Sequence, residues 1–310
     1  MSGPSAPQVR RATLVLLGSA FIWGSMIPFM NELSRTYDNF LLALSRYALG
    51  LPVLWLIVAF VAPPASAPRP IEPGKLFRLC AAMTAFGVLY TFGVAWAHPA
   101  TSAIVLMCGP IWAALLSRAM LAAPTPRGFV PTLAVVMLGG LLVVFGAPGR
   151  PTGGLGLQGG ELLLVVAQLC WSWHSIRAQQ WLGDRGQIRL SAITTTVASL
   201  QLLSIVGVLA ALGMIAMPPR VPTASEWGML AWIGVLGVAI ALLFWNTGVS
   251  LVGVPVASLF SNTAPIFAIG VAVLMGSDPT WLQLAGGAIV LAAIANLQLR
   301  QIRAHRETRP

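Results

Sequence analysis

Long apolar runs, separated by short polar or Pro- and Gly-rich linkers, fill almost the whole chain. About 20 mainly apolar residues span the hydrocarbon core of a bilayer as a helix, because a helix satisfies its own backbone hydrogen bonds there. The runs lack the alternating polarity of membrane-barrel strands. They predict ten transmembrane helices, over residues 11–31, 39–62, 75–97, 99–121, 128–147, 160–181, 188–216, 225–250, 254–275 and 281–300.

Two stretches, 155 residues apart, have matching sequences. Tyr90 begins YTFGVAWAHPATSAIVLMCGPIWA, and Trp245 begins WNTGVSLVGVPVASLFSNTAPIFA. Each stretch is broken near its middle by a short turn and carries a proline in its second apolar run, so that Pro110 aligns with Pro265. Duplicated apolar segments with proline-interrupted helices are typical of transporters built from two repeats. We expect Pro110 and Pro265 to bend their helices.

The linker GAPGRPTGGLGLQGG divides the chain into two parts, residues 1–150 and 151–310, the second ending in a basic tail. Each part holds five predicted helices, which is an odd number. The second part therefore enters the membrane from the opposite side to the first. The predicted fold is an all-α integral membrane protein whose ten transmembrane helices form two inverted five-helix repeats. Such repeats bind substrate near the bilayer midplane, where the two halves meet.

Composition and charge support a membrane protein and set its orientation. Hydrophobic residues make up 57% of the chain and charged residues only 8%, whereas soluble domains average about 25% charged residues. The net charge of +10 does not predict a nucleic-acid partner, because the basic residues lie in predicted loops and tails. With the N-terminus in the cytoplasm, 14 of the 18 Lys and Arg residues lie on the cytoplasmic side. This asymmetry predicts a bacterial inner-membrane protein with both termini in the cytoplasm.

Several chemistries find no support in the sequence. No phosphate-binding loop and no HExxH or CxxC motif is present, and the three cysteines lie in apolar segments as buried thiols. We therefore expect no enzyme activity, no cofactor and no metal site. No carboxylate falls in the middle of a predicted span, which argues against cationic drug export through a membrane carboxylate and favours neutral or zwitterionic substrates. The carboxylates closest to the spans lie near helix ends: Glu32, Glu161, Glu226 and Asp278.

Four aromatic residues are candidates for the walls of a substrate site. Trp23, Tyr90, Trp171 and Trp245 lie deep in predicted helices, and Tyr90 and Trp245 occupy equivalent positions of the two matching stretches. They predict a cavity on whose aromatic walls a flat or amphipathic solute stacks. The alternative is that each ring packs against lipid or a neighbouring helix. Other tryptophans lie near predicted helix ends, as interfacial anchors do: Trp181, Trp227, Trp232 and Trp281.

Four polar residues are candidates for hydrogen bonds to a substrate. His174 shares a helical face with Trp171. It either hydrogen-bonds a substrate carboxylate or titrates during transport, or it bonds to a neighbouring helix. Ser258, Ser261 and Asn262 form one polar stripe just before the second proline. Asn246 adds an amide beside Trp245. The predicted hydrogen-bonding residues are His174, Asn246, Ser258 and Asn262.

The chain resembles the ten-helix EamA-type carriers of the drug/metabolite transporter superfamily along essentially its whole length. The resemblance rests on AFIWGSMIPF in the first helix, on Arg46 in the second, and on TSAIVLMCGPIWAALL, AQLCWSWHSI and VASLFSNTAPIFAIGVAVLMGSDPTWLQLAGGAIVLAA further on. Members of this family mostly export metabolites, amino acids among them. The glutamates that members often carry at the ends of the fourth and ninth helices are replaced here by 118–123 and Ser277-Asp278.

The resemblance and the aromatic residues together imply an exporter of amino acids, aromatic ones favoured, and of similar amphipathic metabolites by alternating access. The aromatic lining is most similar to the branch that exports aromatic amino acids. The alternatives are a drug or nucleotide-sugar carrier of the same superfamily, or a non-transporting membrane assembly subunit. The expected partners are a small-molecule substrate and the lipid bilayer. The oligomeric state is left open, with a monomer as one alternative.

Overall fold

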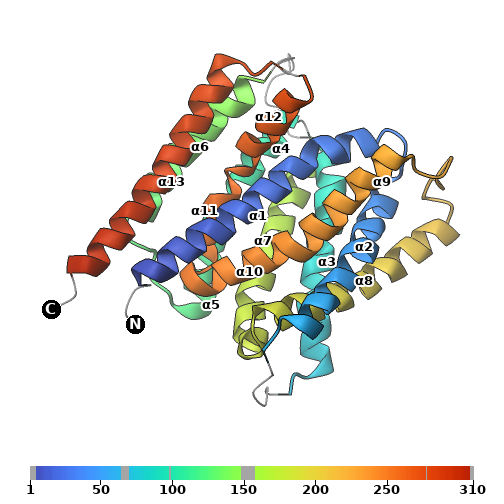
Figure 1. The fold of residues 1–310 in the computed structure, drawn as a ribbon, viewed down its shortest axis with the longest axis horizontal. Coiled ribbons are helices and arrows are strands. Elements are labelled where there is room, and N and C mark those ends of the chain that lie inside the picture. The colour runs from blue at the N-terminus through green and yellow to red at the C-terminus, as the bar shows by residue number, and fades with distance from the viewer. Residues whose placement is uncertain (1–4, 64–69, 98, 148–157, 277, 308–310) are drawn as a thin grey trace.

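The computed structural model describes residues 5–63, 70–97, 99–147, 158–276 and 278–307, and all regular structure in these ranges is helical. Figure 1 shows the helices running side by side in one bundle. The first half contains α1 (Ala6–Leu33), α2 (Asn39–Phe60), α3 (Pro73–Trp96), α4 (Pro99–Met107), α5 (Gly109–Leu121) and α6 (Phe129–Phe145). The second half contains α7 (Gly160–Leu182), η1 (Gly183–Arg185), α8 (Gln187–Ala211), α9 (Ala224–Ala231), the π-helix η2 (Trp232–Ile240), α10 (Ala241–Val252), α11 (Val254–Ser261), α12 (Ala264–Leu274) and α13 (Trp281–Glu307).

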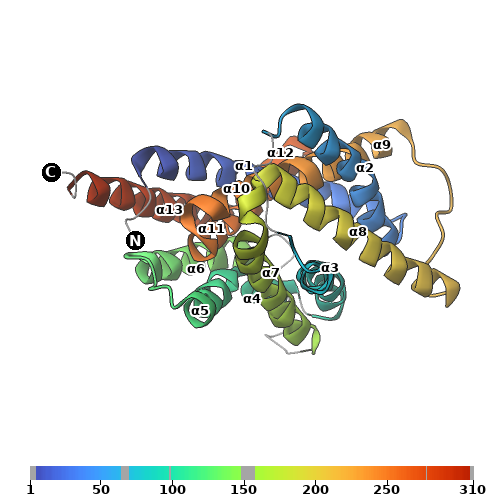
Figure 2. The same cartoon turned by 90° about the horizontal axis from the view of Figure 1, so that it is seen from below.

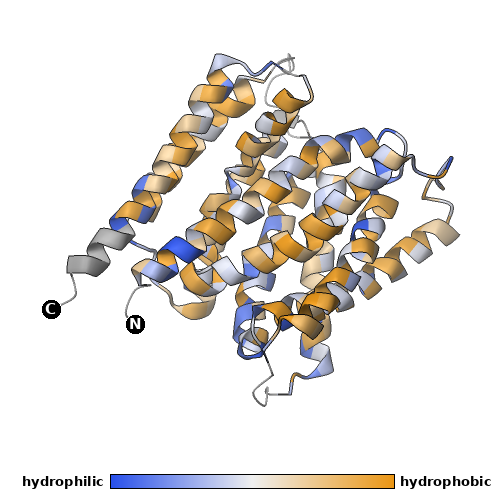
Figure 3. Cartoon of the chain, in the orientation of Figure 1, coloured by the Kyte–Doolittle hydropathy of each residue, from blue (hydrophilic) through white to orange (hydrophobic). Residues whose placement is uncertain are grey.

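The length and apolarity of the helices fit a protein that crosses a membrane several times. Within the described ranges, eight helical segments are long and apolar enough to span a bilayer, and α6 is a shorter apolar helix. Apolar residues cover the lengths of the helices, while polar residues gather at their ends and in the loops (Figure 3). The more polar α7 is not among the eight. The predicted number of ten spans, which requires both α6 and α7 to cross, stays a prediction.

Two of the predicted spans are broken into pairs of short helices at corresponding places. The span predicted over 99–121 divides into α4 and α5 at Cys108, and the span predicted over 254–275 divides into α11 and α12 at Asn262 and Thr263. Pro110 and Pro265 each lie in the first turn of the second piece. Proline is tolerated there because the first turn has no internal acceptor for the backbone N–H that proline lacks.

The two halves pack against each other through long antiparallel pairs of helices. The pair α1 and α10 lies at the centre of the bundle, and α3 packs against α7 (Figure 1). In the first pair the side chain of Leu16 covers Gly248, and in the second pair the side chain of Leu164 covers Gly93. These are the aligned glycines of the two matching stretches. The same kind of contact therefore joins the halves at two equivalent places.

A further pair of helices, α6 and α13, lies side by side at one edge of the bundle (Figures 1 and 2). Gly139 of α6 and Gly286 of α13 face each other so closely that a Cβ atom on either glycine would overlap the backbone carbonyl oxygen of the other. Small residues allow this close approach of helix backbones, which is how membrane helices gain van der Waals contact. The α6–α13 pair is therefore held by backbone contact.

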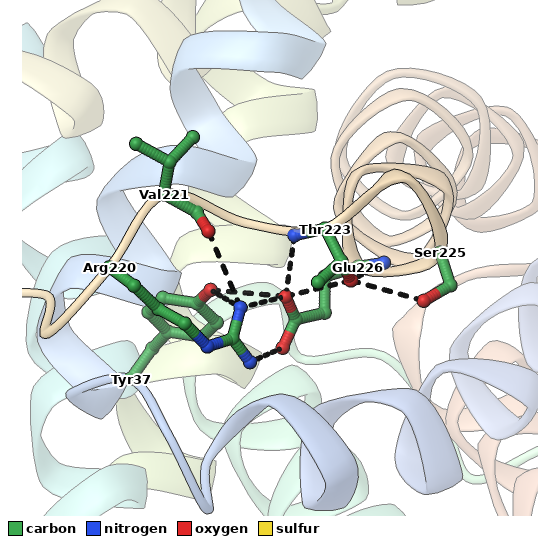
Figure 4. Close-up of polar contacts among 6 residues, drawn as sticks. All are labelled: Tyr37, Arg220, Val221, Thr223, Ser225 and Glu226. Carbon is green, nitrogen blue, oxygen red and sulfur yellow. Dashed lines mark hydrogen bonds and ion pairs between the residues drawn. The ribbon is translucent and has the colours of Figure 1, made fainter.

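At the end of the bundle opposite the start of α1, a polar network joins the halves (Figure 4). We call it the Glu226 network. Arg220, from the segment before α9, donates to both carboxylate oxygens of Glu226 at 2.7 Å, and the backbone N–H of Thr223 donates to Glu226 at the same distance. Tyr37, from the turn between α1 and α2, donates to Glu226 at 3.2 Å. Burial raises the pKa of Tyr37, so its hydroxyl keeps its proton at neutral pH.

Replacing Gly286→Ala tests the α6–α13 contact. The added methyl group meets backbone rather than a side chain that moves aside, so we expect the free energy of unfolding to fall by about 1–3 kcal/mol. The matched control is Gly270→Ala, because nothing lies within 4 Å of a Cβ atom at Gly270. Thermal unfolding in detergent should show a lower midpoint for the first variant and an unchanged or higher midpoint for the second. Equal midpoints would show that α6 and α13 do not meet at these glycines.

Replacing Glu226→Gln tests the Glu226 network. The variant keeps the shape of the side chain but removes its charge, and we expect a lower unfolding midpoint at low salt, because hydrogen bonds to a charged group are lost. The matched control is Glu32→Gln, whose pair with Arg35 is exposed and local and should contribute less than about 0.5 kcal/mol. Unfolding midpoints at two salt concentrations measure both. A loss no larger in Glu226→Gln than in the control would contradict the network.

Candidate functional site

Three tryptophan rings, each from a different helix, meet at the centre of the bundle. Trp23 comes from α1, Trp171 from α7 and Trp245 from α10. The ring centroids of Trp23 and Trp245 are 5.7 Å apart, those of Trp171 and Trp245 are 5.7 Å apart, and those of Trp23 and Trp171 are 6.1 Å apart. Tilted and edge-on pairs at these distances are favourable, because the positive edge of one ring faces the negative face of another. We call these residues the tryptophan cluster.

Aromatic residues of α3 continue this cluster toward the surface. The ring of Phe86 lies 5.0 Å from that of Trp171 and 5.7 Å from that of Tyr90. Tyr90 is 39% exposed, whereas Trp245, at the equivalent position of the second matching stretch, is 2% exposed. The four predicted aromatic residues thus lie in one connected group, with Phe86 as the link. Phe86 was not predicted, although its position one helical turn before Tyr90 would have identified it.

The π-helix η2 holds α1 in place beside the tryptophan cluster. The indole N–H of Trp23 donates to the backbone carbonyl of Gly237 at 3.1 Å, and Ser19 donates to the carbonyl of Ala241 at 2.9 Å. The indole N–H of Trp232 donates to Ser25 at 3.0 Å, so this residue lies between helices rather than serving only as an interfacial anchor. Short π-helical segments occur often at functional sites. No pattern in the sequence predicted this π-helix.

His174 stacks on Trp171 with the ring centroids 5.9 Å apart, and it is almost completely buried. Its Nδ1 lies 2.9 Å from the backbone carbonyl oxygen of Leu79 in α3. A carbonyl oxygen only accepts, so Nδ1 carries the proton of this bond. Nε2 is buried and has no hydrogen-bond partner in the described part of the chain. His174 therefore joins α7 to α3 through one nitrogen and leaves the other nitrogen free to accept a hydrogen bond.

The other predicted polar residues make hydrogen bonds inside the protein. Asn246 donates to Ser191 of α8 at 2.8 Å, Ser258 donates to the carbonyl oxygen one turn earlier at 2.8 Å, and Asn262 donates to the carbonyl oxygen of Met107 at 3.1 Å. The bond from Asn262 connects the break between α11 and α12 to the corresponding end of α4. These three hydrogen bonds join parts of the protein other than the rings of the tryptophan cluster.

One pocket, of about 390 Å³, lies beside the cluster toward the end of the bundle at which α1 begins. It is bounded by the last turns of α5, α7 and α10 and by the start of α11, and Ser117, Gln179 and Gln180 supply polar groups. Ile176 and Val249 line it and also pack in the core cluster that contains Trp245. None of the eight predicted binding residues lines this pocket. The tryptophan cluster and this pocket are neighbouring parts of one central region.

The described residues contain no group of three or more His, Cys, Asp or Glu side chains that lie close enough together to hold a metal ion. Indole rings, a histidine nitrogen and amide groups contact apolar and aromatic solutes and form hydrogen bonds with polar ones.

Comparison with known proteins supports a transport role. The model of the EamA-like transporter family matches residues 10–146 and again residues 158–297, once in each half of the chain. The "Uncharacterized transporter YyaM" of Bacillus subtilis (strain 168) is 21% identical over 213 residues, which are 67% of this chain and 67% of that protein. A protein of known crystal structure superposes with a TM-score of 0.75 at 19% identity, over 94% of this chain and 98% of that one. At that identity the superposition shows the fold alone.

The two matches of the family model together cover most of the chain. They coincide with the two halves whose helices pack in equivalent pairs. The chain belongs to the EamA-like transporter family.

Proposed function

We propose that this transporter exports amino acids, aromatic ones favoured, and similar amphipathic metabolites across a bacterial inner membrane by alternating access. The observation that carries the proposal is the meeting of Trp23, Trp171 and Trp245 from α1, α7 and α10 at the junction of the two halves. A substrate ring would replace one of these ring contacts with a contact of the same kind. Trp23, Tyr90, Trp171 and Trp245 would then form the walls of the substrate site.

Polar groups of the same region would bind the polar part of the substrate. The free Nε2 of His174 is an acceptor that suits the ammonium group of an amino acid. Asn246, Ser258 and Asn262 already hold protein partners. They would bind substrate by exchanging those partners as the helices move. The helix breaks before Pro110 and Pro265 are the places where we propose that this movement bends α4–α5 and α11–α12.

Alternating access requires two halves that exchange equivalent positions, and we propose that they are inverted repeats. Three packing features support this: the matched glycine contacts of α1–α10 and α3–α7, the reciprocal contact of Gly139 and Gly286, and the contact of Trp23 with Trp171. Each pairs one half with the corresponding part of the other, as a pseudo-twofold axis requires.

The charges suggest which end of the bundle faces the cytoplasm. Arg10, Arg11 and Arg118 lie at the end where α1 begins, and the central pocket opens there. The Glu226 network joins the halves at the other end. We propose that substrate enters from the cytoplasm through the pocket and leaves after the Glu226 network has opened.

Uptake into proteoliposomes tests the proposal. The wild-type protein should take up labelled L-tryptophan or L-phenylalanine faster than empty liposomes. Replacing Trp171→Ala should lower this uptake about tenfold, because an aromatic contact and its buried area are lost. The matched control is Trp281→Ala, since Trp281 is 74% exposed on the outside of the bundle and should leave uptake unchanged.

Unlabelled competitors extend the same experiment to the alternatives. Aromatic amino acids should compete with the label, and nucleotide sugars and cationic drugs should not. A wild-type flux equal to that of empty liposomes, or an equal loss of uptake in Trp171→Ala and Trp281→Ala, would contradict the proposal.

A further inference from the structure

Arg46, in α2, is a basic residue for which the structure provides no counter-ion. Its Nε atom is buried and has no hydrogen-bond partner, and no ion pair reaches the side chain from any residue in the described ranges. A charged group in apolar surroundings is costly unless something pairs with it. The arrangement therefore indicates a partner that comes from outside the protein.

The position of Arg46 separates it from the arginines that face water. It lies seven residues after Asn39, where α2 begins, which places it roughly 10 Å from that end of the helix at 1.5 Å per residue. That depth is inside a hydrocarbon core about 30 Å thick. Among the arginines whose side chains the structure describes, the others without a recorded partner are exposed: Arg10, Arg11, Arg118 and Arg127.

The three carboxylates that flank α1, α2 and α9 at this end of the bundle are engaged elsewhere. Glu32 pairs with Arg35, Asp38 accepts from the backbone N–H of Phe40 at the start of α2, and Glu226 binds Arg220. None of them is available to neutralise Arg46. The backbone of Arg46 lies against Gly234 of the π-helix η2. The helix α2 therefore packs closely on η2 at this residue.

Packing contacts place Arg46 beside the tryptophan cluster. Its backbone lies against Gly234 of η2, and Gly237, three residues further along η2, accepts the indole N–H of Trp23. Tyr47, the next residue of α2, packs against the core cluster that contains Trp245. A solute whose ring contacts the tryptophan cluster therefore lies near the part of α2 that carries Arg46.

We propose that Arg46 binds the carboxylate of the substrate while the substrate ring contacts the tryptophan cluster. The guanidinium fork matches a carboxylate with two parallel hydrogen bonds. One arginine balances one negative charge, whereas a phosphate carries up to two. Arg46 thus favours an aromatic substrate whose polar end carries a single carboxylate, as an amino acid does, and the pairing neutralises the guanidinium and the carboxylate inside the membrane. This inference rests on the proposed function, since it assigns the polar end of the same substrate.

Ligand-induced thermal stabilisation of the purified protein tests the proposal, because a ligand stabilises only as far as it binds. The ligands are L-tryptophan, its amide, L-leucine and uridine monophosphate. Wild type should bind L-tryptophan at least tenfold more tightly than the amide. Arg46→Gln should lose this discrimination, with an affinity for L-tryptophan about tenfold or more weaker, as expected when a hydrogen bond to a charged group is lost.

Two further variants keep the test sharp. Arg46→Lys keeps the charge without the two-pronged guanidinium group. Its affinity for L-tryptophan should be several-fold weaker than that of wild type, and its affinity for the amide should be unchanged. This variant replaces Arg46→Gln in the test if Arg46→Gln does not fold. Arg35→Gln, on an exposed arginine at the same end of the bundle, should bind all ligands as the wild type does.

Without ligand, Arg46→Gln should unfold at a higher temperature than wild type, because an unpaired charge has been removed. A purely structural role predicts a lower temperature.

The outcomes separate this inference from the proposed function. Equal binding of L-tryptophan and its amide in wild type and Arg46→Gln would overturn the role of Arg46 and leave the aromatic site standing. If L-leucine binds as tightly as L-tryptophan and both affinities fall in Arg46→Gln, the role of Arg46 is supported and the aromatic preference is overturned. Arg46-dependent binding of uridine monophosphate alone would overturn the assignment to a carboxylate.

Discussion

The cost of leaving a polar group without a partner in apolar surroundings explains how the centre of this protein is built. Water does not reach a bilayer interior, so helices satisfy side-chain donors and acceptors with one another. Trp23 and Ser19 bind carbonyl groups of the second half, and His174 binds the carbonyl of Leu79 across α7 and α3. These bonds position the aromatic rings. The buried groups without a hydrogen-bond partner in the described residues include His174 Nε2 and Arg46 Nε, which we propose as contacts for a solute.

Repetition determines how the halves meet, and a departure from repetition determines the character of the centre. Leu16 on Gly248 and Leu164 on Gly93 are equivalent contacts. The partner of α1, however, is α10, which directly continues the π-helix η2. The partner of α7 is α3, which is a regular α-helix throughout. The first half also contributes the partly exposed Tyr90 where the second contributes the buried Trp245. The centre between the two repeats thus has two different sides, and we propose that this suits a substrate with an apolar end and a polar end.

The repeat could be found from the sequence because apolar length, glycine positions and prolines are local patterns. The same patterns identified the membrane class, the family and four aromatic residues that prove to be connected through ring contacts. Hydrogen-bond partners could not be predicted from the sequence, because they depend on the rotation of one helix against another. The polar stripe of Ser258 and Asn262 faces backbone carbonyls, and the π-helix left no periodic signature. In the sequence, Arg46 entered only the charge count and the family resemblance, and the fold then showed that no described residue forms an ion pair with it.

The central claim is that an aromatic solute binds between the halves, with its ring on the tryptophan cluster. A structure of the protein with bound L-tryptophan, determined by electron cryo-microscopy with a bound antibody fragment to add mass, tests this most directly. The account predicts density for the indole ring in contact with Trp23, Trp171 or Trp245. Density confined to the pocket between the last turns of α5, α7 and α10, or to the lipid-facing surface, would contradict it.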